Sequence, residues 1–372
     1  ARRHPLGMID LPPRDGASGL DAARIAQAAR RHGLHASTAR AGTAAGCDAP
    51  VSVVVCTRDR PQSLAACLSA LDRLRDPDFE VVVVDSASRD GATRRVVART
   101  SARYVREDRP GLDWARRRGA AESRHEIVAY VDDDVRVDPW WLHGVREAFS
   151  DPSVGLMTGL VLPAELETRA QHLFEQYGGM GKGFRARTFR ADTMTADARL
   201  ATHALGVGAN MAFRRGALDR IGGFDTRLDV GTPARGGGDL DAFSRALRAG
   251  LAVRYEPAAL AWHCHRRDLE ALHRQVRDNG VAFGVYLIHA WRDRRASTAE
   301  VARFGLWRWF GGHLLRRLGR GVLGREALPL SLLWAETRGA LEAPFAYVAA
   351  HRHDRRVRRL HADRAPVKEL AT

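Results

Sequence analysis

The chain has 372 residues, a length typical of about two domains, and its 45% hydrophobic and 28% charged content excludes a largely disordered protein. Its 59 Lys and Arg outnumber its 44 Asp and Glu, which gives a formal net charge of +15. Only Lys182 and Lys368 are lysines, so the excess is almost entirely guanidinium. Such an excess is typical of proteins that bind phosphates, nucleic acid or anionic membranes, and equally of a GC-rich coding sequence.

The four cysteines are spread without a Cys-x-x-Cys pair, which argues against a disulfide framework and a structural zinc site. No run of about 18 apolar residues occurs, so no membrane-spanning helix is expected. Residues Ala1–Asp10 lack the apolar segment of a secretory signal. We therefore expect a cytoplasmic protein.

The chain divides into three regions by pattern. Residues 1–49 are rich in Ala, Arg and Gly and predict an appendage with one short helix after Ser18–Asp21. Short apolar runs follow at 51–56, 80–85 and 127–132, as expected for parallel strands buried between helices. Between them, helical spacing predicts helices at 63–74, 93–99 and 112–123, with a short strand at 103–105. This alternation predicts an α/β domain with right-handed crossovers.

Polar side chains follow each of the three apolar runs, at Thr57–Arg60, Asp85–Ser88 and Asp132–Asp134. Sheets of this kind bind ligands outside the carboxyl ends of their strands. A single Asp after a strand is more often a turn or a helix cap. Three such strand ends at one edge of a sheet favour a ligand site.

These residues and further motifs resemble the family 2 glycosyltransferases. The matching segments are Val51–Arg60, Val82–Asp90, Gly111 with Ala115 and Arg116, Val131–Asp134, Gly206–Arg215, Gly222–Asp225 and Gly237–Asp241. The resemblance covers residues 50–270 and implies the GT-A fold, an α/β fold in which helices sandwich a Rossmann-like, mostly parallel sheet. Residues 271–372 then form a basic helical extension. The implied activity is an inverting, metal-dependent sugar transfer from a nucleoside diphosphate donor, most often UDP, to an acceptor hydroxyl.

Asp132 and Asp134 form an Asp-x-Asp motif, whose first and third side chains share a face in an extended segment. Two carboxylates suit Mg²⁺ or Mn²⁺, which would neutralise the diphosphate leaving group. The resemblance adds His263 as a third metal ligand or a diphosphate contact, and it places Asp133 at the ribose or the donor sugar. The alternative is that Asp132–Asp134 form an acidic turn that binds no metal.

The resemblance also implies a nucleotide and donor site at the strand ends and on one helix. Its residues are Thr57, Arg58, Asp59, Asp85, Ser86, Arg116, Asp132 and Asp133. In the family, the equivalent of Asp85 contacts the base. Ser86 stands where the family has a second acidic residue, which leaves the base identity open. An arginine such as Arg116 can pair with two diphosphate oxygens at once.

Sugar transfer needs a carboxylate that takes the proton of the acceptor hydroxyl. Family members use the Asp of a Glu-Asp pair that opens a helix. Here Gly238 holds the Glu position, and Asp239 aligns with the base. An N-cap role is the alternative for Asp239, with Asp241 as the reserve base. Asn210 and Asp241 are expected in the cleft for the acceptor and the sugar.

Residues 271–372 contain 19 Lys and Arg against 9 Asp and Glu, so most of the net charge lies there. Aromatic and aliphatic residues are interleaved with arginines over 304–318, a pattern typical of a helix on an anionic membrane surface. It is equally typical of an amphipathic helix that packs on the catalytic domain. Residues 328–348 are apolar, but Glu336, Arg338 and Glu342 argue against a span.

The expected acceptor is a lipid-linked glycan, a cell-wall glycan or a small natural product. A nucleotidyltransferase with a related sheet is a first alternative, but Thr57–Pro61 lacks the Gly-rich, Lys-containing loop it would need. A non-catalytic protein that binds nucleic acid or an anionic surface is a second. No RNA-binding or zinc-finger motif supports it, and we expect no nucleic-acid partner. The predicted location is cytoplasmic, at the inner face of the membrane if the basic helices bind lipid.

Overall fold

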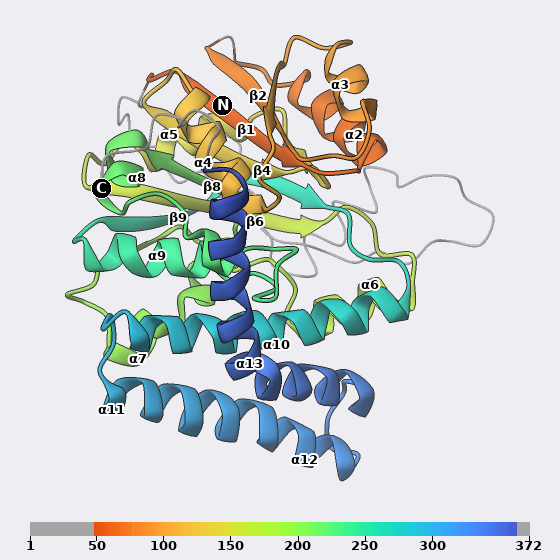
Figure 1. Ribbon diagram of the computed structural model, residues 1–372, viewed down its shortest axis with the longest axis vertical. Helices are drawn as coiled ribbons and strands as arrows, with labels where there is room; N and C mark the ends of the chain where they lie inside the picture. The colour runs from red at the N-terminus through yellow and green to blue at the C-terminus, as the bar shows by residue number, and fades with distance from the viewer. Residues whose placement is uncertain (1–47, 77, 363–372) are drawn as a thin grey trace, which may run out of the picture.

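The computed structural model describes residues 48–76 and 78–362, and the helix predicted after Ser18 lies outside them. A nine-stranded sheet with the order β3-β2-β1-β4-β8-β6-β9-β5 forms the centre, and β7 pairs with β9. Figure 1 shows helices around this sheet and a further layer of C-terminal helices beyond it. The predicted α/β fold with a C-terminal helical extension is confirmed.

The strands combine a parallel half with a mixed half. Their bounds are β1 (Val51–Thr57), β2 (Phe79–Ser86), β3 (Arg103–Glu107), β4 (Ile127–Asp132), β5 (Val135–Val137), β6 (Val154–Pro163), β7 (Arg187–Phe189), β8 (Asn210–Arg214) and β9 (Ala252–His263). Strands β3, β2, β1 and β4 are parallel, as the sequence predicts. Strand β8 is antiparallel to β4 and β6, while β6 is parallel to β9. The carboxyl ends of β1, β2 and β4 therefore meet at one edge.

The helices of the sheet domain lie mainly in its connections. They are α2 (Pro61–Leu71), α3 (Ala92–Val97), α4 (Leu112–Glu122), α5 (Trp141–Ala148), α6 (Arg169–Tyr177), α7 (Ala196–Leu200), α8 (Arg215–Arg220) and α9 (Gly238–Arg248), with 3₁₀ turns η1 (Thr202–Ala204) and η2 (Thr226–Leu228). The C-terminal layer consists of α10 (Leu269–Arg292), α11 (Thr298–Val301), the π-helix η3 (Ala302–Leu315), α12 (Arg316–Val322) and α13 (Leu330–Leu360).

Alternate residues of β1 build the two hydrophobic layers that hold helices to the sheet. Val53 and Val55 pack in one layer with α2 and α5, whereas Val54 and Cys56 pack in the other with α4 and α9. Side chains of successive strand residues point to opposite faces, so a run that is apolar at every position is buried on both. All seven residues of β1 are buried.

The C-terminal layer depends on close contact between α10 and α13. A Cβ on Gly280 would lie 2.2 Å from the carbonyl oxygen of Glu336, and one on Gly339 would lie 2.0 Å from that of Arg277. Glycine at both positions therefore lets the two backbones approach. Among the helices of the described residues, none is both long enough and apolar enough to cross a bilayer.

Candidate active site

A cleft of about 680 Å³ separates the sheet domain from the C-terminal helices. One wall comes from α4, the end of β4, the loop before β8 and the start of α9, which supply Asp113, Arg116, Asp132, Gly208 and Asp239. The opposite wall comes from α10, η3 and α13. The cleft thus lies at the carboxyl end of a parallel strand, where α/β sheets bind their ligands.

Three glycines precede Asp239 in the chain, and a side chain would be unfavourable at each of these positions. Gly236 and Gly237 have φ angles of +140° and +102°, a region that residues with a side chain avoid. A Cβ on Gly238 would lie 1.8 Å from Oδ2 of Asp113. The carboxylate of Asp113 therefore fills the space beside Asp239 that a side chain at position 238 would need.

Asp239 lines the cleft from the first turn of α9, and backbone groups fix its orientation. Its Oδ2 accepts a hydrogen bond from the N–H of Gly208 at 2.9 Å, and its Oδ1 accepts one from the N–H of Leu240 at 2.9 Å. The N-cap of α9 is Gly237, so Asp239 is not the capping residue. Each carboxylate oxygen has a second lone pair, which leaves Asp239 able to accept a further proton.

Arg116 is a buried guanidinium between two carboxylates of the cleft. Its Nη1 donates to Oδ1 of Asp113 at 3.0 Å, and its Nη2 lies 4.0 Å from Oδ1 of Asp132. Burial raises the pKa of Asp113 to about 7, although Arg116 opposes the shift. Asp113 N–H donates to Oδ1 of Asp229, and the Oδ2 atoms of both aspartates are buried without a hydrogen-bond partner. The sequence analysis missed Asp113; its place two residues after Gly111 was the available signal.

A second arginine, Arg60, bridges two carboxylates of the Asp132–Asp134 motif. Its Nη1 donates to Oδ1 of Asp133 at 2.5 Å, and its Nη2 donates to Oδ2 of Asp134 at 2.8 Å. The hydroxyl of Thr57 donates to the other oxygen of Asp133 at 2.6 Å. Burial raises the pKa of Asp133 to about 6. The end of β1 therefore holds the end of β4 through side chains.

Asp134 begins a row of polar contacts that leads to α6. Its Oδ1 lies 3.3 Å from Nε2 of His263, whose Nδ1 lies 2.8 Å from Nδ1 of His265. His265 Nε2 lies 2.9 Å from Oε1 of Glu175. Burial would raise the pKa of Asp134, but the hydrogen bond from His263 and the charge of Arg60 hold it well below its usual value. The rings of His263 and His265 therefore lie between Asp134 and Glu175 in one row of contacts.

Asp132, Asp134 and His263 offer two carboxylates and one imidazole, a donor set that suits Mg²⁺ or Mn²⁺. Asp134 and His263 present their ligand atoms 3.3 Å apart, close enough to share one ion. Asp132, the last residue of β4, lies on the side of Arg116, and no choice of ligand atoms brings Asp132, Asp134 and His263 all within 4.8 Å of one another. Burial raises the pKa of Asp132, a cost that a nearby cation would relieve. The chemistry of this donor set therefore fits a divalent cation.

Asp85 and Ser86 lie at the end of β2 and are bonded within the protein. Asp85 accepts hydrogen bonds from the hydroxyl of Tyr104 at 2.8 Å and from the N–H of Ser88 at 3.0 Å. The hydroxyl of Ser86 donates to the carbonyl oxygen of Gly111 at 3.0 Å. Neither residue lines the 680 Å³ cleft. Their contact with a nucleotide stays a prediction.

Arg58 and Asp59 form the turn after β1. Arg58 is exposed, and Asp59 has a φ of +55°. The N–H of Asp59 donates to the hydroxyl of Ser88 at 3.0 Å, and its Oδ1 accepts from the N–H of Arg89 at 2.8 Å. These bonds join the turns that follow β1 and β2, so the two strand ends form one unit.

Asn210 is buried away from the cleft. Its amide nitrogen donates to the carbonyl oxygens of Leu160 and Ala259, and its oxygen accepts from Nε1 of Trp141 at 2.9 Å. The side chain therefore joins β6, β9 and α5. A role in sugar binding stays a prediction for Asn210.

Asp241 is fully buried one turn into α9, outside the cleft wall. Its Oδ2 accepts from Nε of Arg245 at 2.7 Å, and its Oδ1 pairs with Arg295. Two guanidinium groups thus satisfy this carboxylate within the protein. As a reserve base, Asp241 would have to leave both partners.

The second wall of the cleft is aromatic and comes largely from the C-terminal layer. The rings of Phe283 and Trp309 lie 4.8 Å apart, and Phe304 and His203 pack against Phe283. Burial lowers the pKa of His203 to about 4, so its ring is neutral near pH 7. Apolar walls with a few polar groups are typical of small-molecule sites. The sequence analysis assigned none of these four residues to the site, because they reach the cleft only through tertiary packing.

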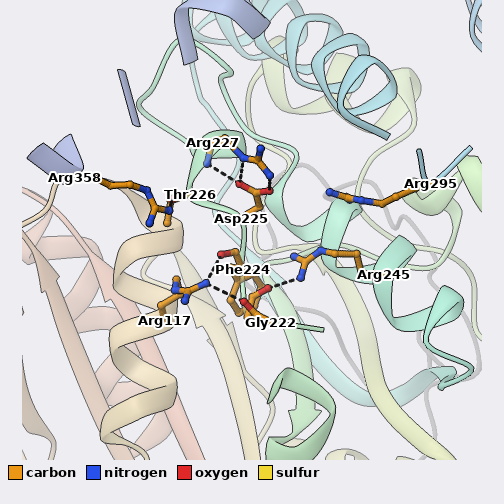
Figure 2. A pocket seen from close by; sticks show the side chains of 10 residues that line it. Arg117, Gly222, Phe224, Asp225, Thr226, Arg227, Arg245, Arg295 and Arg358 are labelled. Carbon is orange, nitrogen blue, oxygen red and sulfur yellow. Dashed lines mark hydrogen bonds and ion pairs between the residues drawn. The ribbon is translucent and has the colours of Figure 1, made fainter. Parts of the chain in front are cut away.

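A separate pocket of about 290 Å³ lies behind α9 and is lined by five arginines, which are Arg117, Arg227, Arg245, Arg295 and Arg358. Figure 2 shows Arg117 and Arg245 directed at backbone carbonyl groups of the 222–224 turn, and Arg227 paired with Asp225. Arg358 donates to the hydroxyl of Thr226 at 2.9 Å. These contacts join this turn to α4, α9 and α13.

One cluster in the described part of the chain brings three metal-ligating side chains within 4.8 Å of one another, namely Asp225, His289 and Asp293. Arg227 donates to Asp225 at 2.6 Å, and Arg295 donates to Asp293 at 2.7 Å. Arg295 also lies 2.9 Å from Nε2 of His289. Two guanidinium groups already neutralise this cluster, so it is an ion-pair network.

The chain is similar in sequence to known glycosyltransferases. The model of the family described as Glycosyl transferase family 2 matches residues 52–222. Glycosyltransferase AglE of Haloferax volcanii is 24% identical over 265 residues, which cover 69% of this chain and 79% of that protein. Pre-mycofactocin glycosyltransferase of Mycobacterium tuberculosis is 28% identical over 222 residues. That match covers 59% of this chain but only 43% of the relative.

Among solved structures, the mannosyltransferase PcManGT from Pyrobaculum calidifontis, in complex with GDP-Man and Mn²⁺, is similar with a TM-score of 0.48. It is 19% identical, and the similarity covers 86% of this chain and 76% of that one. The family match spans β1 to β8 and includes Asp113 and Asp132 of the cleft, whereas Asp239 lies beyond it. Residues 52–222, somewhat less than half of the chain, therefore match the domain of glycosyltransferase family 2.

Proposed function

We propose that this enzyme transfers a sugar from a nucleoside diphosphate donor to an acceptor hydroxyl, with inversion at the anomeric carbon. One observation carries the proposal. Arg116, which suits a diphosphate, and Asp132, which suits a divalent cation, line the same cleft as Asp239, which suits a hydroxyl proton. A donor held by Arg116 would therefore place its sugar beside the carboxylate of Asp239, since both side chains border Gly208.

At the donor end, Arg116 supplies a fixed positive charge for the diphosphate. Asp113 holds this guanidinium in place through the 3.0 Å hydrogen bond. Asp132, Asp134 and His263 would hold Mg²⁺ or Mn²⁺, which supplies positive charge to the leaving diphosphate. Thr57 and Arg60 keep the carboxylates of this motif in position. UDP is the donor nucleotide that we propose to test first.

At the acceptor end, Asp239 takes the proton of the attacking hydroxyl. The backbone bonds from Gly208 and Leu240 fix the plane of its carboxylate before substrate binds. Such fixed orientation lowers the entropy cost of reaching the reactive geometry. One displacement with one base inverts the configuration, since no second carboxylate has to form a covalent intermediate.

The acceptor is expected against the aromatic wall of Phe283, Phe304 and Trp309. Lipid-linked glycans, cell-wall glycans and small natural products all offer a hydroxyl on an apolar ring or chain. Because this wall belongs to the C-terminal layer, we propose that this layer selects the acceptor.

The substitution Asp239→Asn tests the assignment of the base. It should lower the turnover number about 10²- to 10⁴-fold, because an amide cannot accept the proton, while donor binding stays intact. Turnover is measured with radiolabelled UDP- and GDP-sugars, and binding by the shift of the melting temperature. Asp241→Asn is the matched control, and it should lower stability because it weakens two ion pairs. Near-normal turnover of Asp239→Asn would show that Asp239 is not the base.

The substitution Asp134→Ala tests the donor end. Stabilisation of the wild-type protein by a nucleoside diphosphate should require Mn²⁺ or Mg²⁺ and disappear with EDTA. Asp134→Ala should abolish this metal-dependent shift. Without metal and nucleotide, the melting temperature of the variant should differ from that of the wild type by less than the size of this shift. A shift that EDTA leaves unchanged would exclude metal-assisted donor binding.

A further inference from the structure

Helix α13 carries a stripe of exposed residues along its length, spaced three or four apart. The stripe consists of Leu330, Trp334, Arg338, Leu341, Phe345, Val348, Arg352, Arg355 and Arg359. Residues at this spacing lie on one side of a straight helix, and Pro344 divides α13 into two such segments between Leu341 and Phe345. We call these nine residues the α13 stripe.

The apolar members of the α13 stripe are strongly exposed. Phe345 is 80% exposed, Leu341 52% and Trp334 51%. The side of α13 that packs inward is different, since Leu333, Ala340 and Ala343 are buried. The α13 stripe is therefore not needed for packing within the described residues. Figure 1 shows α13 as two legs that meet at a bend, of which the second crosses in front of α10 and α9.

The composition of the α13 stripe changes along the helix. Five of its first six residues are apolar, and its last three are arginines. Among the described residues, Arg352, Arg355 and Arg359 have no carboxylate within ion-pair distance. A parallel second copy of α13 would bring these arginines face to face, which is unfavourable. An antiparallel copy would set arginines against the apolar half.

An anionic bilayer offers suitable contacts to both the apolar half and the arginine half of the α13 stripe. Its headgroups neutralise the arginines, and its interface accepts aromatic and aliphatic side chains. We propose that the α13 stripe docks this enzyme on the surface of an anionic phospholipid membrane. The helix lies in the interface, in keeping with the lack of a bilayer-crossing helix among the described residues.

The neighbouring helix η3 also carries exposed apolar side chains, and other residues of it line the cleft. Leu306 and Trp307 are 71% and 79% exposed on η3. Phe304 and Trp309 of the same helix line the cleft. A docked enzyme would therefore hold its aromatic wall next to the membrane. The docking itself does not depend on the proposed transfer reaction.

Vesicle flotation of the full chain tests the proposal. The protein should float with phosphatidylglycerol vesicles at low salt, float less at high salt, and stay unbound with phosphatidylcholine vesicles. The double variant Trp334→Ser, Phe345→Ser should bind about a hundredfold more weakly, because each buried aromatic side chain is worth about tenfold. Both residues are exposed, so the melting temperature should stay unchanged.

Two further variants separate the contribution of the apolar side chains of the α13 stripe from that of its arginines. Leu269→Ser is the matched control, an exposed apolar residue on α10 outside the α13 stripe, and it should float like the wild type. Replacement of Arg352, Arg355 and Arg359 by Gln should remove most of the salt dependence. The proposal fails if wild-type protein does not float with phosphatidylglycerol at low salt, or if the double variant floats equally well. A dimer in light scattering that the double variant dissociates would also overturn it, in favour of a second copy.

Discussion

The backbone N–H of Gly208 donates to Oδ2 of Asp239 at 2.9 Å, and the same glycine leaves no room for a side chain. A Cβ on Gly208 would lie 2.9 Å from the Cβ of Asp239 and 2.9 Å from Nη2 of Arg116. The proposed base and the proposed diphosphate contact thus share one small space. Its size depends on glycine at this position.

The substitution Gly208→Ala should therefore displace both side chains. We expect a loss of about a hundredfold in turnover, since a shift of roughly 1 Å in reacting groups has this effect. Gly216→Ala is the control, because a Cβ there meets nothing within 4 Å. Steady-state kinetics and melting temperatures of both variants check the prediction. Equal activity of the two variants would contradict it.

The buried carboxyl group of Asp113 should make stability depend on pH. Burial raises its pKa from 3.8 to about 7 in the folded protein, so the unfolded chain releases this proton first as the pH rises. Its contribution to the free energy of unfolding should fall between about pH 4 and pH 7 and stay low above that. A shift of this size corresponds to roughly 4 kcal/mol as an order of magnitude.

Asp113→Asn should remove this part of the pH dependence. Urea unfolding at about pH 5 and about pH 8 should show a smaller loss of stability for the variant than for the wild type. Asp192→Asn, at an exposed position, serves as the control and should follow the wild type. If Asp113→Asn and the wild type lose stability in parallel, the carboxyl group is already ionised at pH 5.

The close contact between α10 and α13 should contribute to the stability of the protein. Gly339→Ala should destabilise the protein by about 1–3 kcal/mol, because the new Cβ would overlap the carbonyl oxygen of Arg277. Gly319→Ala lies in α12 with nothing within 4 Å and should stabilise by up to about 1 kcal/mol. Urea denaturation measures both changes. The two substitutions should change the free energy of unfolding in opposite directions. A Gly339→Ala variant that is more stable than the wild type would contradict the close packing of α10 and α13.

The parallel half of the fold could be predicted from the sequence because local patterns determine it. The run Val51–Cys56 is apolar at every position, and the helix after it has its own periodicity. The mixed half depends on contacts between distant segments, such as β8 with β4 and β6 with β9. No local pattern specifies those pairings, so the sequence analysis did not describe them.

The candidate site likewise combines residues that stand in local motifs with residues that only tertiary contacts bring together. Asp132, Asp134 and Asp239 stand in motifs that can be recognised in the sequence, and two of them line the cleft. Asp113 stands between Gly111 and Ala115, but that signal does not reveal its place beside Gly238, which depends on tertiary contact. For Asp241, the arginine four residues later was a signal of an internal ion pair.

The two walls of the cleft come from different stretches of the chain, one within residues 112–240 and the other within 279–336. Mutations in η3 or α13 can therefore reshape the wall proposed for the acceptor without touching Asp132 or Asp239. Under the proposed function, changes confined to the last hundred or so residues would alter the choice of acceptor and leave the donor chemistry as it is.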